Sequence, residues 1–160
     1  GVKPAVLFKN IAQPLITALS TSSSAATLPV SMDAAQNRFR VSSEVSSVVL
    51  PLGATVNMDG TALFEGVAAV FLAQMFGIAL DPITITTIFL VAMMASIGAP
   101  GIPSGSMAGM QLVLLAVGIP LEAIALLLMI ERPLDTFRTA VNVQGDLVGS
   151  LVVNKRVTLQ

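Results

Sequence analysis

A row of polar side chains follows one face of the last apolar segment of the chain. This polar stripe consists of Glu131, Asp135, Arg138, Thr139, Asn142 and Asp146. At about 100° per helical residue, these positions fall within an arc of about 100°. Each unpaired charge in a membrane helix costs about 2.5 to 3.5 kcal/mol, so the stripe together with Arg132 costs on the order of 15 kcal/mol. A structural ion-pair seam would explain an isolated pair equally well, but a stripe of this cost predicts a polar or water-filled functional site.

A second set of candidate ligands is the pentapeptide Asn57-Met58-Asp59-Gly60-Thr61. It combines an amide, a carboxylate and a hydroxyl with a glycine that frees backbone carbonyls from the helix. Sodium prefers such oxygen ligands, and an unwound turn beside a carboxylate provides them. The alternative is a glycine kink with Asp59 directed toward solvent.

Two loop-forming tracts complete the candidate chemistry. Ser20-Thr21-Ser22-Ser23-Ser24 and the stretch from Gly98 to Gly105, which includes Gly101, offer amides and hydroxyls for a carboxylate ligand. Either tract alone is more typical of a plain turn.

The composition places these residues in a membrane. The 160 residues are 54% hydrophobic and 11% charged, with a net charge of −1, and they contain no Cys and no His; the mean hydropathy is +0.88. So few charges cannot cover a soluble enzyme, and no basic stripe exists for nucleic acid. The missing residue types exclude disulfides, a Cys/His zinc site and a Ser-His-Asp triad.

The loop tracts divide the two long charge-free stretches of the chain, residues 10–32 and 82–121. Each break leaves arms of roughly 12 to 17 residues, too short to cross about 30 Å of hydrocarbon as helices. Two re-entrant helical hairpins fit better, and irregular backbone at membrane depth must face protein or water.

We therefore expect an all-α integral membrane fold with an inverted repeat of a hairpin and an interrupted transmembrane helix. Its boundaries are residues 1–41 (first hairpin), 42–80 (helix interrupted at Asn57), 81–119 (second hairpin) and 120–160 (last helix, interrupted by the polar stripe). The basic residues flank the first hairpin and the end of the last helix: Lys3, Lys9, Arg38, Arg40, Lys155 and Arg156. The positive-inside rule then predicts that the first hairpin enters from the cytoplasm and the second from outside.

Four motifs in order resemble the dicarboxylate/amino acid:cation symporter family, the glutamate transporters. They are Thr21-Ser22-Ser23-Ser24 with Leu28-Pro29-Val30, Asn57-Met58-Asp59-Gly60-Thr61, Ala95-Ser96-Ile97-Gly98, and Asp135-x-x-Arg138-Thr139-x-x-Asn142-Val143-x-Gly145-Asp146. The resemblance covers essentially the whole chain as the C-terminal half of such a transporter. Because the chain starts with Gly1 and not Met, we expect a piece of a longer protein, and the resemblance implies a homotrimer formed through an N-terminal scaffold.

The resemblance implies a role for each matching residue. Arg138 would hold the side-chain carboxylate of an acidic amino acid, and Asp135 its amino group. The rest of the substrate site would be Ser23, Ser24, Thr61, Gly101, Thr139 and Asn142. One sodium would bind the carboxylate of Asp146 and the carbonyls of Gly53, Asn57 and Asn142. A second sodium would bind the carbonyls of Thr55, Met58, Ser96, Ile97 and Ala99. Asp59 would bind a third sodium. The second hairpin would be the extracellular gate.

Two departures from the family pattern concern specificity and coupling. Members that take acidic amino acids usually carry an extra Arg where this chain has Thr21 or Thr136. Phe64-Glu65 replaces the Tyr-Glu of eukaryotic relatives, where the Glu is linked to proton and potassium coupling. Glu65 either carries a proton with the substrate, or pairs with Arg132 or an upstream residue and stays ionised.

The resulting hypothesis is sodium-coupled symport of aspartate or glutamate by a protein of the bacterial inner (plasma) membrane, with no enzymatic activity, no cofactor besides coupling sodium ions, and no nucleic-acid partner. A proton-coupled dicarboxylate or neutral amino acid transporter of the same family is the alternative. An intramembrane aspartyl protease built on Asp59 and Asp146 lacks its Tyr-Asp and Gly-x-Gly-Asp contexts. A purely structural membrane scaffold would leave the convergence of cation and anion ligands unexplained.

Overall fold

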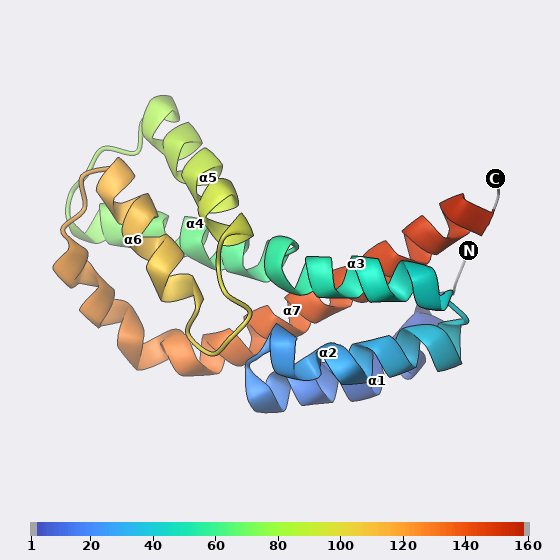
Figure 1. The fold of residues 1–160 in the computed structure, drawn as a ribbon. Coiled ribbons are helices and arrows are strands. Elements are labelled where there is room, and N and C mark those ends of the chain that lie inside the picture. Colours follow the sequence, from blue (N-terminus) through green and yellow to red (C-terminus); the bar gives the residue numbers. More distant parts are fainter. Residues whose placement is uncertain (1–2, 159–160) are drawn as a thin grey trace.

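The computed structural model describes residues 3–158, and within them helices are the only regular secondary structure, as expected (Figure 1). The α-helices of this part are α1 (Pro4–Thr21), α2 (Ser24–Asp33), α3 (Ser43–Val56), α4 (Asp59–Met75), α5 (Pro82–Ile97), α6 (Ser106–Ala116) and α7 (Ile124–Thr158). A π-helical turn, η1 (Ala34–Arg38), extends α2, and a 3-10 turn, η2 (Leu121–Ala123), precedes α7.

The serine tract separates α1 from α2. Ser22 ends α1 in the left-handed conformation at φ 50°, and Ser23 caps α2 by accepting a hydrogen bond from the amide of Ala26 at 3.1 Å. The two helices, of 18 and 10 residues, return alongside each other as a hairpin (Figure 1). The predicted break is therefore confirmed, although its arms are less equal than expected.

A second hairpin is formed by α5 and α6. Asp81 caps α5 by accepting from the Thr84 amide at 2.7 Å, and Pro82 follows at the first helical position. These hydrogen bonds lower the pKa of Asp81 below its ordinary value. After Ile97 the chain leaves the helix until Ser106, which confirms the break predicted from Gly98 to Gly105.

The two segments that were expected to be interrupted transmembrane helices, residues 42–80 and 120–160, differ in whether the helix is broken. Asn57 and Met58 interrupt the helix between α3 and α4, as predicted. The second interruption was predicted wrongly, because α7 is continuous over 35 residues with Pro133 inside it. Proline removes only one backbone donor, the hydroxyl of Thr136 donates to the carbonyl of Pro133 at 2.8 Å, and the charged side chains of the stripe pair with each other without unwinding the helix.

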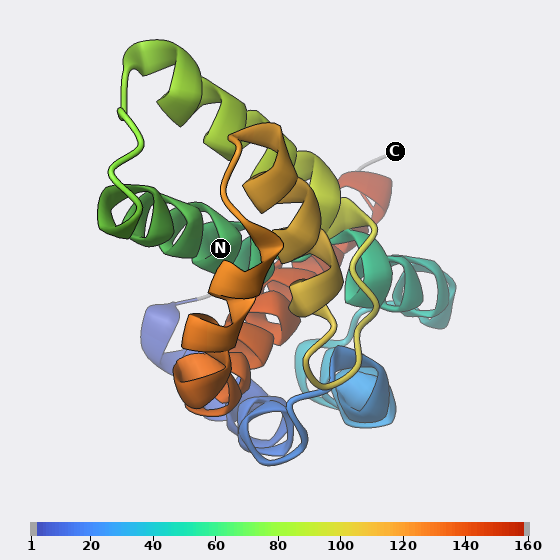
Figure 2. The same cartoon turned by 90° about the vertical axis from the view of Figure 1, so that its left-hand side faces the viewer.

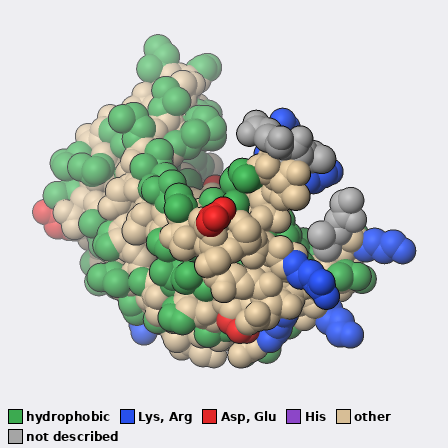
Figure 3. Space-filling model, turned by 45° about the vertical axis from the view of Figure 1, so that its right-hand side comes forward, with side chains coloured by type: hydrophobic (Ala, Val, Ile, Leu, Met, Phe, Trp, Pro, Cys, Tyr) green, Lys and Arg blue, Asp and Glu red, His purple; other side chains and the backbone are tan. Residues whose placement is uncertain are grey.

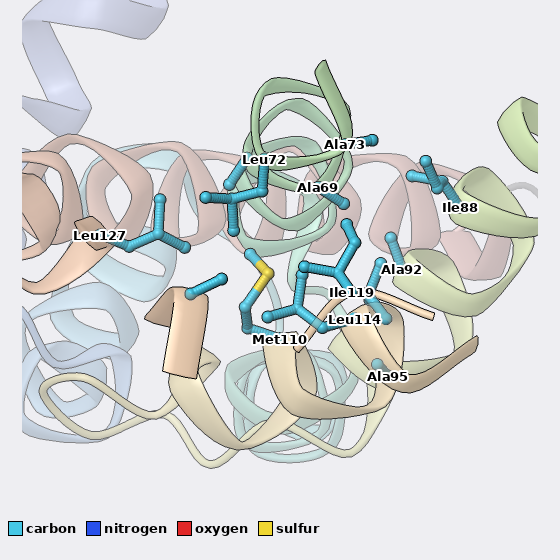
Figure 4. Close-up of a cluster of buried hydrophobic side chains, with 13 residues drawn as sticks. Ala69, Leu72, Ala73, Ile88, Ala92, Ala95, Met110, Leu114, Ile119 and Leu127 are labelled. Atoms are coloured by element: carbon cyan, nitrogen blue, oxygen red, sulfur yellow. The ribbon is translucent and has the colours of Figure 1, made fainter. Parts of the chain in front are cut away.

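The helices pack around two hydrophobic cores joined by α7. The first core lies between α4, α5, α6 and the start of α7 (Figure 4), and its members are Ala68, Ala69, Leu72, Ala73, Ile88, Ala92, Ala95, Met110, Val113, Leu114, Ile119, Ala123 and Leu127. The second lies between α1, η1, α3 and the later part of α7, with Ile11, Ala18, Ala35, Val41, Val45, Leu50, Val143 and Leu147. Figures 1 and 2 show α7 passing from one group of helices to the other.

Large apolar side chains also cover much of the outer surface (Figure 3). Ile83 is 77% exposed and Met129 is 80% exposed. The segment Ser43–Met75, which comprises α3, the break and α4, is 33 residues long and apolar enough to cross a membrane, and it is the one such segment found within residues 3–158. Exposed apolar surface of this extent marks contact with lipid or other protein.

Candidate functional site

The polar stripe of α7 faces the interior, as its periodicity predicted. Every member is at most 5% exposed: Glu131, Asp135, Arg138, Thr139, Asn142 and Asp146. The neighbouring Arg132 lies outside the stripe, with its side chain 64% exposed and its guanidinium 3.9 Å from Asp135. The charges that the sequence placed on one face are therefore buried together.

Arg138 is the centre of the site. Its Nη2 donates to Glu131 Oε1 at 2.9 Å and to Asp135 Oδ1, and its guanidinium lies 4.4 Å from the centroid of the Phe64 ring. Its Nη1 is buried without a hydrogen-bond partner among the described residues. Arg138 therefore still has one buried guanidinium nitrogen that can donate to a carboxylate.

The tip of the α5–α6 hairpin lies directly on the acidic residues of α7. The amide of Ser104 donates to Asp135 Oδ2 at 2.9 Å, and its hydroxyl donates to Glu131 Oε2 at 3.0 Å. Ser104 adopts φ 60°, a left-handed conformation that is uncommon outside glycine. The sequence placed Ser104 in the Gly98 to Gly105 tract, whose amides and hydroxyl were expected to bind a carboxylate ligand. Its contacts with Glu131 and Asp135 were not predicted, because no local pattern connects Ser104 to residues about 30 positions later. Glu131 was placed in the polar stripe without a binding role.

The two hairpin tips also meet each other. The hydroxyl of Ser23 donates to the carbonyl of Gly101 at 2.8 Å, and the amide of Ala25 donates to the same carbonyl at 3.1 Å. Between the tips and α7 lies a narrow cavity of about 10 Å³, lined among others by Ser24, Thr61, Gly101, Asp135, Arg138, Thr139 and Asn142. The structure thus brings together seven residues of the predicted substrate set, and Ser23 contacts them through Gly101. A cavity of this size holds about one water, so an amino acid could enter only if a tip moved.

The break between α3 and α4 packs against α7 one helical turn farther along. The amide of Gly60 donates to Asn142 Oδ1 at 2.8 Å, and Asn142 Nδ2 lies 3.2 Å from the hydroxyl of Thr61. A Cβ atom at Gly60 would lie 2.5 Å from the carbonyl oxygen of Arg138. Glycine at this position therefore allows the two backbones to approach each other closely.

The first predicted sodium set is brought together around Asp146. Asn57 Nδ2 donates to Asp146 Oδ1 at 2.9 Å. Gly53 lies so close that an added Cβ would overlap the same carboxylate. Asn142, the fourth member, lies one turn before Asp146 on the same face of α7.

The remaining sodium candidates are less closely joined. Met58, Ser96 and Ala99 are buried, whereas Ile97 is 52% exposed and Thr55 is exposed. The described hydrogen bonds do not link residues 55–58 to residues 96–99. Asp59 is exposed at the start of α4, and a Cβ atom at Gly145 would lie 3.2 Å from its Oδ2.

Glu65 is fully buried on α4, with 0% exposure. Neither of its carboxylate oxygens has a hydrogen-bond partner among the described residues. The predicted alternative of an ion pair with Arg132 is wrong, because Arg132 is directed to the surface beside Asp135. Gly109 of α6 makes room for Glu65, since an added Cβ would overlap its Oε1.

An apolar groove adjoins the site on the outer side of Arg138. It lies between α4 and α7, has a volume of about 440 Å³, and includes Leu63, Phe64, Phe71 and Phe137 in its wall. Arg138 lines both this groove and the narrow cavity, with the Phe64 ring stacked on its guanidinium. The site is thus polar toward the tips and apolar on its opposite side.

Comparison with known proteins gives consistent results. The model of the sodium:dicarboxylate symporter family matches residues 1–156. The chain is 50% identical over 150 residues to excitatory amino acid transporter 2 of Mus musculus, covering 94% of this chain and 26% of that protein. It is 50% identical over 146 residues to excitatory amino acid transporter 3 of Bos taurus (91% and 28%), and 45% identical over 150 residues to an excitatory amino acid transporter of Caenorhabditis elegans (94% and 30%). The chain therefore spans less than a third of the length of these relatives.

Proposed function

Because this chain belongs to the sodium:dicarboxylate symporter family, we propose that it forms the substrate- and ion-binding core of a transporter that carries acidic amino acids together with sodium. The observation that carries this proposal is the buried polar stripe of α7, covered by both hairpin tips. The family and its relatives are named as transporters, in agreement with the expectation of a non-enzyme. The protease alternative built on Asp59 and Asp146 is not supported by that assignment.

In the proposed substrate site, Arg138 binds the side-chain carboxylate through its fork of N–H donors. The unpartnered Nη1 supports this role, because it is a buried donor for which the described residues provide no acceptor. Asp135 binds the amino group. The amides and hydroxyls of the two tips, with Thr61, Thr139 and Asn142, surround the α-carboxylate.

Sodium binds beside this site in the proposed mechanism. Asp146 supplies a carboxylate, and Gly53, Asn57 and Asn142 supply carbonyls, which are the oxygen ligands that a hard cation prefers. The contact of Gly53 and Asn57 with Asp146 supports the first site. The second set (Thr55, Met58, Ser96, Ile97 and Ala99) and Asp59 remain a prediction from family resemblance.

A symporter family resides in the membrane, so the chain is part of an integral membrane protein. We propose that both hairpins are re-entrant, that the two halves of the chain form an inverted repeat, and that the α5–α6 tip opens as the extracellular gate. The narrow cavity supports a moving tip, since it holds about one water. A bacterial inner membrane and a homotrimer remain part of the proposal; the relatives named above are from animals.

Uptake by the full-length protein in proteoliposomes tests this function. An inward sodium gradient should drive accumulation of labelled L-aspartate, excess L-glutamate should compete, and neutral L-alanine should not. By linkage, sodium should tighten substrate binding, and substrate should tighten sodium binding. Equal aspartate affinity when choline replaces sodium would refute the proposal.

A proton-coupled variant of this function is favoured by one observation, the buried and unpartnered carboxylate of Glu65. If Glu65 carries a proton, Glu65→Gln should abolish the pH dependence of net uptake while aspartate exchange survives, because a neutral side chain mimics the protonated form. Unchanged pH dependence in this variant would exclude the carrier role.

A further inference from the structure

Four buried groups connect the α5–α6 tip to the substrate-binding arginine, and we call them the tip network: Ser104, Glu131, Asp135 and Arg138. Glu131 is 2% exposed, and each of its oxygens has one partner. Oε1 accepts from Arg138 at 2.9 Å, and Oε2 accepts from the Ser104 hydroxyl at 3.0 Å. Glu131 is thus the one group in this network that bridges the guanidinium and the serine hydroxyl.

The geometry of α7 makes this bridge possible. Glu131 lies seven residues before Arg138, which is about two helical turns and places both side chains on one face. Asp135 lies between them and contacts Arg138 with Oδ1 and the Ser104 amide with Oδ2. One guanidinium therefore serves two carboxylates, and both carboxylates also hold the tip.

A substrate carboxylate would be the third negative group on this single guanidinium. Three buried carboxylates around one guanidinium repel each other strongly at low dielectric. The only other cation near the network among residues 3–158 is Arg132, whose side chain is 64% exposed and 3.9 Å from Asp135. In the proposed function Asp135 turns to the substrate's amino group, so Glu131 and the substrate carboxylate are the two anions left to share Arg138, and their repulsion favours release of Glu131.

We propose that Glu131 is an internal competitor for the substrate carboxylate on Arg138, and that the same side chain holds the α5–α6 tip closed when no substrate is bound. Of the two carboxylates, Asp135 has a task with substrate bound in the proposed function, whereas Glu131 has none. Displacing Glu131 from Arg138 also weakens its hydrogen bond to Ser104, so substrate binding and tip release are coupled. The inference rests on the proposed function and adds a positioning role to it.

This role separates two modes of transport. Exchange of internal for external substrate needs tip closure only over a bound substrate. Net uptake also needs the tip to close without substrate, and for that step Glu131 supplies the carboxylate that Arg138 and Ser104 otherwise lack. Variants that weaken the bridge should therefore slow net uptake and spare exchange.

The test compares net uptake and exchange of labelled L-aspartate by the full-length protein in proteoliposomes. In Glu131→Gln, the side chain keeps its shape but no longer competes as an anion, so aspartate affinity should rise by about tenfold, the effect of one charged hydrogen bond. In the same variant, the ratio of net uptake to exchange should fall by about tenfold or more. Glu122→Gln changes an exposed glutamate of η2 and should leave both values unchanged.

Ser104→Ala tests the hydrogen bond between Glu131 and the α5–α6 tip separately from the competition between Glu131 and the substrate for Arg138. It removes the hydroxyl but keeps the amide and the Arg138–Glu131 contact, so the uptake-to-exchange ratio should fall while aspartate affinity stays near that of the parent. If Glu131→Gln does not fold, a parental ratio in Ser104→Ala alone overturns the inference. A transporting parent with unchanged affinity and ratio in Glu131→Gln overturns it as well. A parent without sodium-dependent aspartate transport overturns the proposed function, and this inference with it.

Discussion

Gly53 and Gly66 form a matched pair for testing whether the carboxylate of Asp146 binds a coupling ion. Gly53 lies in α3, and a methyl group there would overlap the Asp146 carboxylate, with the added Cβ 2.8 Å from Asp146 Cγ. Gly66 lies in α4, and nothing lies within 4 Å of the Cβ that a substitution would add. The same chemical change therefore disturbs the proposed sodium site at one position and not at the other.

The expected loss of sodium affinity follows from how far the added methyl group displaces the Asp146 carboxylate. Asp146 must retreat by about 0.6 Å or more to reach ordinary contact at 3.4 Å. Its hydrogen bond from Asn57, now 2.9 Å, is then lost or strained. A hydrogen bond to a charged group contributes about 1.5 to 3 kcal/mol, and overpacking costs about 1 to 3 kcal/mol. Gly53→Ala should therefore weaken sodium binding by roughly 10- to 150-fold and lower the free energy of unfolding.

The assay is the sodium dependence of aspartate binding to the purified full-length protein, with thermal unfolding measured on the same samples. In Gly53→Ala the sodium concentration for half-maximal binding should rise at least tenfold. Gly66→Ala should keep the parental sodium dependence and gain about 0.5 to 1 kcal/mol of stability, because alanine favours the helix. Identical sodium dependence in the two variants would show that the Asp146 carboxylate is not an ion ligand.

Three further perturbations follow from other contacts. Arg138→Ala leaves buried carboxylates without a cation at a cost of about 3 to 5 kcal/mol, so aspartate affinity measured by calorimetry should fall at least about 100-fold; affinity within a few-fold of the parent would contradict the assignment. Gly109→Ala places a methyl group on the Glu65 carboxylate and should lower the unfolding temperature, whereas Gly109→Ala with parental stability would show that α6 shifts freely. The lowered pKa of Asp81 means that its cap persists above that pKa and is lost as the pH falls through it. The protection factor of the Thr84 amide against hydrogen exchange should therefore fall in acid, and Asp81→Asn should remove that fall.

Local residue chemistry predicted most of the fold. Serines that cap helices explain the break at Ser22 and Ser23, and the glycines and prolines from Gly98 to Gly105 explain the loop between α5 and α6. Helical periodicity placed the polar stripe on one buried face of α7. The error concerned the polar stripe, whose charges suggested an interruption, whereas side-chain pairing on one face left the helix continuous.

The contacts of the site were less predictable than its members. The pairing of Arg138 with Glu131 and Asp135 follows from spacings of seven and three along one helix, so the sequence held that signal. The Ser104 contact depends on where the α5–α6 tip comes to lie, which residue spacing does not determine. The same holds for Gly109, whose fit to Glu65 arises from the packing of α6 on α4.

The continuity of α7 has a consequence for biogenesis. Its Leu127 completes the first core, and its Val143 and Leu147 complete the second. Because a ribosome synthesises α7 after α1 to α6, both cores lack these side chains until the last of the described helices has left the exit tunnel. A nonsense mutation in the first turn of α7, before Leu127, should therefore leave both cores incomplete at once, whereas one between Leu127 and Val143 should leave only the second core incomplete.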